Sequence, residues 1–347
     1  MDGILVVDKP AGMTSHDVIA AIRRAARQYR GSGGGPPSHG GSGGGPPSHG
    51  GSGGGLPSHG GSGGGPPPHK GRGGGLSRLK VGHTGTLDPD ATGVLVVCVG
   101  RATRLVPYLQ ASAKTYDARI QLGVETTTLD ASGEVTSEQD ASLINETRLC
   151  DALKSFVGEI EQVPPMVSAV KIGGERLYRK ARRGEVVARP PRTVQIHDIV
   201  LEDFEPGPRA EAAFLVTCSA GTYVRTLAAD IGKRLGVGAH LIALRRLGSG
   251  RFGLEDAIDL ATVLELGSHG RLGEVLLSPA EAVADYPTIT LDADAARALT
   301  HGQPLPALGL DGPVAALDSF GRLLAMIANR DGAARPLTVL AGGDPER

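Results

Sequence analysis

The chain has 347 residues, 40% of them hydrophobic, and a formal net charge of −1. It is longer than one average domain and apolar enough to bury a core, so two folded units are expected. Apolar runs such as 94–99 are too short to cross a bilayer, and acids rather than a basic leader stand at the N-terminus, so we expect a cytoplasmic protein with no membrane segment. Three cysteines without a closely spaced pair favour neither a disulfide framework nor a thiolate metal site.

The predicted elements begin with a short apolar strand at 3–7. After a turn, Thr14 and Asp17 have the spacing of a capping box and predict the start of a helix. Val18 and Ile22 lie on one face of that helix, which therefore packs against a core.

The segment 31–75 repeats the decapeptide Gly-Ser-Gly-Gly-Gly-Pro-Pro-Ser-His-Gly with small changes. It has almost no apolar side chains to offset the entropy cost of ordering, so we interpret it as a disordered insertion. Its histidines recur every ten residues, at 39, 49, 59 and 69. Because a flexible period fixes no coordination geometry, a solvated spacer is favoured over a metal-responsive module.

The elements beyond the repeat tract indicate an α+β fold. A polar, glycine-rich loop at 80–93 leads into a strand at 94–99. Further strands are predicted at 116–122, 192–201 and 212–219, and helices at 146–157 and 222–235. Because these elements do not alternate regularly, a βαβ arrangement is disfavoured. From about residue 280 onward, strand patterns at 312–317, 322–329 and 336–340 indicate a small β-rich region.

Basic residues cluster in two stretches although the whole chain is almost neutral. Eight basic residues and two acids stand between Lys171 and Arg192, a local surplus of six. In a second stretch, from Arg225 to Arg251, six basic residues face only Asp230. Each stretch fits either an RNA-binding surface or an ordinary solvated face.

The loop at 80–93 is the best candidate for a reactive site. It places His83 and Asp88 among bare backbone amides, although an Asp before a Pro also suits a structural turn. A nucleophilic carboxylate in a partly dry pocket needs a cation to stay ionised, and Arg225 is a candidate partner.

Other enzyme classes lack their required residues. The chain has neither the His-x-Glu nor the Pro-Cys-x-x-Cys of zinc nucleobase deaminases. Its one Gly-Lys pair, Gly232-Lys233, is followed by Arg, so no Walker loop is present. Gly-x-Ser-x-Gly matches fall inside the repeat tract, which disfavours a serine hydrolase.

Six segments in a fixed order carry a stronger signal. They are Gly3-Ile-Leu-Val-Val-Asp-Lys-Pro-Ala-Gly-Met-Thr-Ser15, Lys80-Val-Gly-His-Thr-Gly-Thr-Leu-Asp-Pro-Asp-Ala-Thr-Gly93, Lys114-Thr-Tyr116, Val163-Pro-Pro-Met-Val-Ser-Ala169, Gly221-Thr-Tyr-Val-Arg-Thr226 and His240-Leu-Ile-Ala-Leu-Arg-Arg246. Together they closely resemble the bacterial tRNA pseudouridine-55 synthase family of the TruB type.

The resemblance implies roles for individual residues. Asp88 matches the catalytic Asp, which attacks the target nucleotide so that uracil leaves through N1 and rejoins the ribose through C5. Attack on the base and attack on the sugar both stay open. Tyr116 matches a tyrosine that packs on the flipped base and is a candidate for moving a proton, and Arg225 matches the arginine that pairs with the Asp. The candidate substrate-binding residues are His83, Tyr223, Leu244 and Lys9 from the motifs, and Lys171, Arg179 and Arg182 from the first basic stretch.

The physics of the reaction agrees with this implied assignment. A uridine in a folded loop must leave its stack before N1 and C1′ can be reached, and aromatic surfaces offset that loss. Only 3% of the chain is aromatic, which makes the placement of Tyr116 and Tyr223 in two motifs informative.

The resemblance also implies an organisation. The expected fold is a pseudouridine synthase fold of the α+β class, with a mixed, mainly antiparallel central sheet flanked by helices and a small β-rich, PUA-like C-terminal domain. We expect a catalytic domain at 1–255, a connecting helical segment at 256–279 and an RNA-binding domain at 280–347. The partner is the T-stem-loop of tRNA, the protein is expected to be a monomer, and neither a metal nor an organic cofactor is called for.

Two other functions fit the same residues. A noncatalytic tRNA-binding or tRNA-folding protein could use the pocket without isomerising a base, although Asp88, Tyr116 and Arg225 together argue against it. A guide-RNA-dependent pseudouridine synthase of the same superfamily is the second alternative, and it would leave a bare T-loop unmodified.

Overall fold

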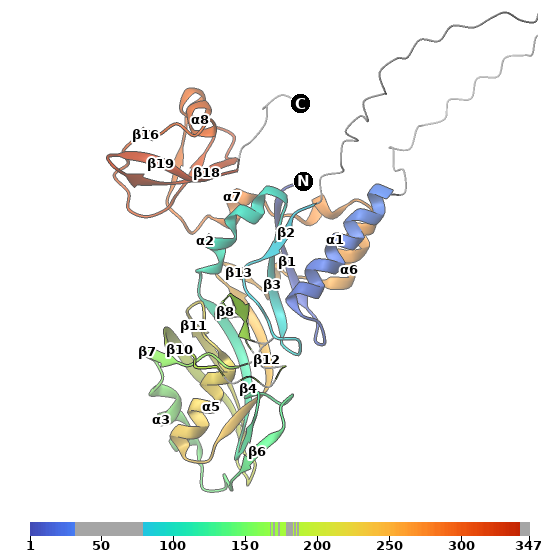
Figure 1. The fold of residues 1–347 in the computed structure, drawn as a ribbon, viewed down its shortest axis with the longest axis vertical. Helices are drawn as coiled ribbons and strands as arrows, with labels where there is room; N and C mark the ends of the chain where they lie inside the picture. The colour runs from blue at the N-terminus through green and yellow to red at the C-terminus, as the bar shows by residue number, and fades with distance from the viewer. Residues whose placement is uncertain are drawn as a thin grey trace, which may run out of the picture.

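The computed structural model describes residues 1–31, 79–166, 168, 171–172, 174–177, 183, 185 and 187–340 (Figure 1). The predicted repeat insertion therefore lies almost wholly outside the described residues, as do Arg179 and Arg182. Each helix in the described ranges is too short or too polar to span a bilayer.

A large sheet organises the chain up to about residue 260. Within the described ranges ten strands belong to it, and eight of them follow the order β14-β1-β3-β12-β4-β11-β10-β7. These strands are β1 (Gly3–Lys9), β3 (Thr92–Val99), β4 (Lys114–Leu122), β7 (Gly158–Gln162), β10 (Arg192–Glu205), β11 (Glu211–Cys218), β12 (Ala239–Ser249) and β14 (Ile258–Asp259). The short strands β2 (Val81–His83) and β13 (Phe252–Gly253) pair with β3 and β12. Among the described strands of this sheet, only β1–β14 and β3–β12 are parallel pairs, which confirms the predicted mixed, mainly antiparallel sheet.

The alternation in β4 shows why this sequence forms a sheet. Every second residue from Lys114 to Leu122 is buried, and the residues between them are partly exposed. Tyr116, Ala118 and Ile120 on the buried face pack in one core with residues of β11 and of nearby helices. A strand with one buried face is held in register because a slip of one residue would expose that face.

Four helices pack against the sheet, and Figure 1 shows where they lie. They are α1 (Ser15–Gly31), α3 (Glu146–Lys154), α5 (Val224–Leu235) and α6 (Leu260–Ser268). The predicted capping box of α1 is confirmed, because the Thr14 amide donates to the Asp17 carboxylate at 2.9 Å and the Asp17 amide donates to Thr14 Oγ1 at 3.1 Å. The helices α1 and α6 share a core with β1 and β3, whereas α3 and α5 share one with β4 and β11.

Shorter elements complete the first part of the chain. They are the 3-10 helices η1 (Gly100–Leu105), η2 (Leu254–Asp256) and η3 (Leu272–Val275), the helices α2 (Val106–Gln110) and α7 (Pro279–Ala282), and the hairpins β5 (Val124–Thr126)–β6 (Val135–Glu138) and β8 (Lys171–Ile172)–β9 (Glu175–Arg176).

The C-terminal region is β-rich, as predicted. Five strands form its sheet within the described ranges, in the order β15-β17-β18-β19-β16. They are β15 (Thr288–Thr290), β16 (Leu305–Pro306), β17 (Val314–Leu317), β18 (Leu323–Arg330) and β19 (Ala333–Val339), with the helix α8 (Ala293–Thr300) packed against them. The predicted strand at 336–340 begins earlier than expected, at Ala333.

Two features of the large sheet were not predicted. The strand β12 inserts between β3 and β4, although its sequence carries adjacent arginines at its centre. The segment after residue 256 contributes β14, which pairs with β1, and α6, which packs against α1.

Candidate active site

The segment 84–91, which joins β2 to β3, is held rigidly at its backbone. The Thr84 amide donates to the Val96 carbonyl at 3.1 Å. Ser15, buried at the start of α1, accepts from the Leu87 amide at 2.9 Å and donates to the Leu87 carbonyl at 3.2 Å. Because both the backbone amide and the carbonyl of Leu87 are hydrogen-bonded, the adjacent Asp88 has a defined position.

Lys9 is the second anchor of this loop. Its Nζ donates to the carbonyls of Pro10, Pro89 and Ala91 at 2.8, 2.9 and 2.7 Å, and the residue is 0% exposed. Burial lowers the pKa of Lys9 to about 8. The end of β1 is thus tied to the two residues on either side of Asp90.

We expect Lys9→Met to destabilise the protein by about 3 kcal/mol, because three backbone carbonyls lose the charged donor that they share. Urea unfolding of the variant measures this loss. Lys80→Met, which removes an exposed lysine next to β2, is the control and should stay within about 0.5 kcal/mol of the parent. Equal stability of the two variants would contradict the anchoring role.

Asp88 and Arg225 lie in direct contact although 137 residues separate them. Arg225 Nε lies 2.9 Å from Asp88 Oδ2, and Nη2 donates to Oδ1 at 3.1 Å, so the pair is bidentate. Arg225 Nη1 also donates to Asp130 Oδ2 at 3.1 Å and to the Thr128 carbonyl at 3.2 Å. A single buried guanidinium therefore joins two carboxylates, and its planar fork fixes their relative geometry.

The two carboxylates differ in their electrostatic setting. Burial raises the pKa of Asp88, with the charge of Asp130 acting in the same direction and that of Arg225 opposing them. The pKa of Asp130 is lowered despite burial, because Ser132 and Thr128 donate hydrogen bonds to it and Arg225 lies close. Asp88 keeps 41% of its side-chain surface exposed. A ligand in the pocket can therefore reach Asp88, whereas Asp130 accepts a hydrogen bond from Arg225 and helps to position it.

A cavity of about 350 Å³ opens above Asp88. Asp88, Tyr116, Tyr223, Arg225 and Leu244 all line it, so the structure brings together five of the predicted site residues. Two aromatic rings and an aliphatic side chain around a carboxylate offer stacking surfaces and one reactive group, in a volume within the range of small-ligand sites.

Tyr116 is held from the neighbouring strand. It is 8% exposed, and Arg246 is its direct partner across the β12–β4 pair. The Arg246 guanidinium is fixed in turn, because its Nε donates to the Val94 carbonyl at 2.6 Å. Burial raises the pKa of the Tyr116 phenol, and the charge of Arg246 opposes this. The phenol is therefore protonated at neutral pH and can donate a proton into the cavity.

Of the other predicted site residues, two have described side chains that do not line the cavity. Lys9 contacts the loop backbone rather than the cavity, and His83 lies outside it, with its ring 5.4 Å from that of His16. Lys171 is described only as part of the backbone of β8. Arg179 and Arg182 lie outside the described residues.

Three site residues had no assigned role from the sequence. Asp130 follows Leu129, whose φ of 64° is unusual for a bulky residue. The position of Asp130 depends on this turn, which the sequence does not indicate. Arg246 and Lys114 stood inside recognised motifs without an assigned role, and the structure shows that they are 1% and 6% exposed and line the cavity. Burial of charged side chains is rare enough to mark a functional setting, but it is invisible in sequence. Among the described residues, no group of three His, Cys, Asp or Glu side chains could hold a metal ion.

Family models match nearly all of the chain beyond the repeat tract. Residues 75–224 match the model of the TruB family pseudouridylate synthase N-terminal domain. Residues 225–284 match a tRNA pseudouridylate synthase B C-terminal domain, and residues 286–341 match the C-terminal model of tRNA pseudouridine synthase II.

Curated relatives match over similar lengths. A tRNA pseudouridine synthase B of Thermobifida fusca is 40% identical over 98% of this chain and 99% of its own. One of Symbiobacterium thermophilum is 46% identical over 87% of this chain and 82% of its own. Among solved structures, a chain of a Cbf5-Nop10-Gar1 complex is 26% identical, with a TM-score of 0.65 over 98% of this chain and 85% of that one.

Proposed function

The chain belongs to the TruB family of pseudouridylate synthases, and from this we propose how its residues isomerise a uridine of tRNA. It is a tRNA pseudouridine synthase that acts on the T-loop uridine, uridine 55. The alternatives of a noncatalytic tRNA-binding protein and of a guide-RNA-dependent enzyme are not favoured. The observation that carries the proposed mechanism is the bidentate contact of Asp88 with Arg225 at the base of the cavity.

Asp88 is the catalytic carboxylate in this proposal. The Arg225 guanidinium keeps it ionised although burial raises its pKa, so that a lone pair is available for attack on the nucleotide. The N1–C1′ bond then breaks, the uracil turns, and a bond forms between C5 and C1′. The proton lost from C5 balances the one gained at N1, so no cofactor is consumed.

Tyr116 lies against the flipped base and moves a proton. Its phenol is suited to this because Tyr116 lines the cavity and its raised pKa keeps it protonated. Tyr223 and Leu244 offer further surface for the extruded uridine, which offsets the loss of stacking in the RNA loop.

Lys9 supports the site through the backbone of the loop that carries Asp88, and the remaining predicted residues act on the RNA outside the cavity. We assign His83 to the looped-out strand beside the target, and Lys171, Arg179 and Arg182 to its phosphates. We keep the domain division at 1–255, 256–279 and 280–347, with the C-terminal region as a PUA-like RNA-binding domain. Because Asp88, Tyr116 and Arg225 come from one chain, a monomer suffices for the reaction. The cytoplasm is its proposed location.

Purified protein is expected to convert uridine to pseudouridine in a bare T-stem-loop RNA, without a guide RNA or a protein partner. Because the product has the same mass as the substrate, the readout is mass mapping after a chemical tag specific for pseudouridine. An unmodified T-loop together with activity on a guided duplex would contradict the proposal and favour the guide-dependent alternative.

A further inference from the structure

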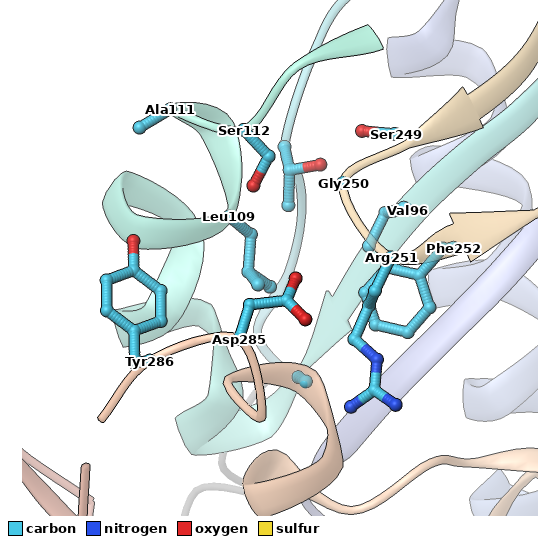
Figure 2. A pocket seen from close by; sticks show the side chains of 12 residues that line it. Val96, Leu109, Ala111, Ser112, Ser249, Gly250, Arg251, Phe252, Asp285 and Tyr286 are labelled. Carbon is cyan, nitrogen blue, oxygen red and sulfur yellow. The ribbon is translucent and has the colours of Figure 1, made fainter. Parts of the chain in front are cut away.

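A second cavity, of about 210 Å³, adjoins the active site. Thr84 lines both cavities, so they share a wall. The second cavity lies between the turn at 249–252, the end of α2 and the segment that follows α7, as Figure 2 shows. This volume is many times the roughly 10–15 Å³ that a cavity needs to admit one water molecule, which leaves room for a planar heterocycle.

A buried cation stands between the two cavities. Lys114 lines the active-site cavity, and its Nζ donates to the Gln110 carbonyl and to the Ser112 carbonyl, both at 2.5 Å. Gln110 belongs to the lining of the first cavity and Ser112 to that of the second. No acid within the described ranges pairs with Lys114, and burial, with the charge of Arg246, lowers the pKa of Lys114 to about 8. A cation in this position suits the phosphate of a strand that runs from one cavity to the other.

The lining of the second cavity suits a base rather than a phosphate. Leu109, Val96 and Phe252 supply apolar walls, and Tyr286 supplies an aromatic edge. Figure 2 shows the Asp285 carboxylate pointing into the space between Leu109 and Phe252. Asp285 stands at the exposed mouth of the cavity and makes no hydrogen bond or ion pair with the described residues, and the nearby Arg251 donates instead to the Glu281 carbonyl. An unpaired carboxylate repels phosphate but accepts hydrogen bonds from an amino group on a base.

We propose that this second cavity holds the base of a nucleotide adjacent to the target uridine, and that Asp285 selects a base with an exocyclic amino group. Lys114 then contacts the phosphate that joins the two nucleotides. This inference rests on the proposed function, because it needs RNA bound with its target uridine in the first cavity. The second cavity would then be a second place where the enzyme recognises a base of the RNA loop.

The test compares stem-loop RNAs that carry cytidine or uridine on the 5′ or the 3′ side of the target. With the parent protein, replacing cytidine by uridine on one of the two sides is expected to raise KM about tenfold, the loss typical of a missing base-edge contact. Asp285→Ala should reduce this ratio to within about twofold, with kcat unchanged at saturating RNA. Ala111→Phe, which fills the cavity from its exposed rim, should raise KM for all four RNAs.

The matched control is Asp311→Ala, which removes an exposed carboxylate of the C-terminal region and should preserve the parent ratio. Equal ratios for the parent and Asp285→Ala would overturn the inference, as would an unchanged KM for Ala111→Phe. A parent protein that modifies none of the four RNAs would instead overturn the proposed function, so the two failures are distinguishable.

Discussion

Asp88→Ala is expected to abolish pseudouridine formation while the affinity for tRNA stays within a few fold of the parent. Removal of a nucleophile typically lowers the rate by at least about 10⁴-fold. Affinity is preserved because the cavity keeps Tyr116, Tyr223 and Leu244, and because one negative charge near the RNA is lost. Single-turnover conversion of a T-stem-loop and filter binding of the same RNA measure the two quantities.

Asp90→Ala is the matched control for this change, since Asp90 is an exposed carboxylate two residues away on the same loop. It should retain parent-like turnover. Turnover by Asp88→Ala, or equal losses in the two variants, would refute the catalytic role of Asp88.

Arg225→Met and Asp130→Asn are expected to move the acidic limb of the pH–rate profile in opposite directions. Activity requires ionised Asp88, so it falls as the pH drops through the pKa of that group. Arg225 lowers this pKa, and its loss should move the limb to higher pH. Asp130 raises it, and neutralising Asp130 should move the limb to lower pH.

The two changes also differ in the size of their effects at neutral pH. Arg225→Met removes the fork that positions Asp88, and a misplaced catalytic group costs about 10²-fold in kcat. Asp130→Asn keeps an oxygen that can accept from Arg225, so its loss should be smaller. The readout is kcat/KM against pH, with thermal unfolding of each variant as the check on folding. Limbs that shift in the same direction would contradict the proposed electrostatic network.

Much of the fold could be predicted because its periodicity is local. The alternation in β4 and β11 and the capping box of α1 are properties of adjacent residues. The strand β12 was missed because Arg245 and Arg246 interrupt its apolar pattern. Their charges are accommodated only by distant groups, Asp8 for the first and the Val94 carbonyl for the second.

The site was predictable where it could be matched to recognised motifs. Asp88, Tyr116 and Arg225 were each identified there, but only the folded sheet shows that they meet. Asp130 had no comparable signal, since its function depends on a guanidinium 95 residues away along the chain. Such partners are set by tertiary contact, which single-sequence patterns do not carry.

The place of β12 in the sheet has a consequence for biosynthesis. β3 and β4 are consecutive long strands in the sequence, yet β12 lies between them and is made more than a hundred residues later. A nascent chain on the ribosome that stops short of residue 239 therefore leaves open one edge of β4 and the part of β3 that β2 does not cover, and open strand edges are prone to pair with other chains. Emergence of β12 covers these edges and brings Arg246 beside Tyr116, so the same strand that completes the sheet also completes the wall of the active-site cavity.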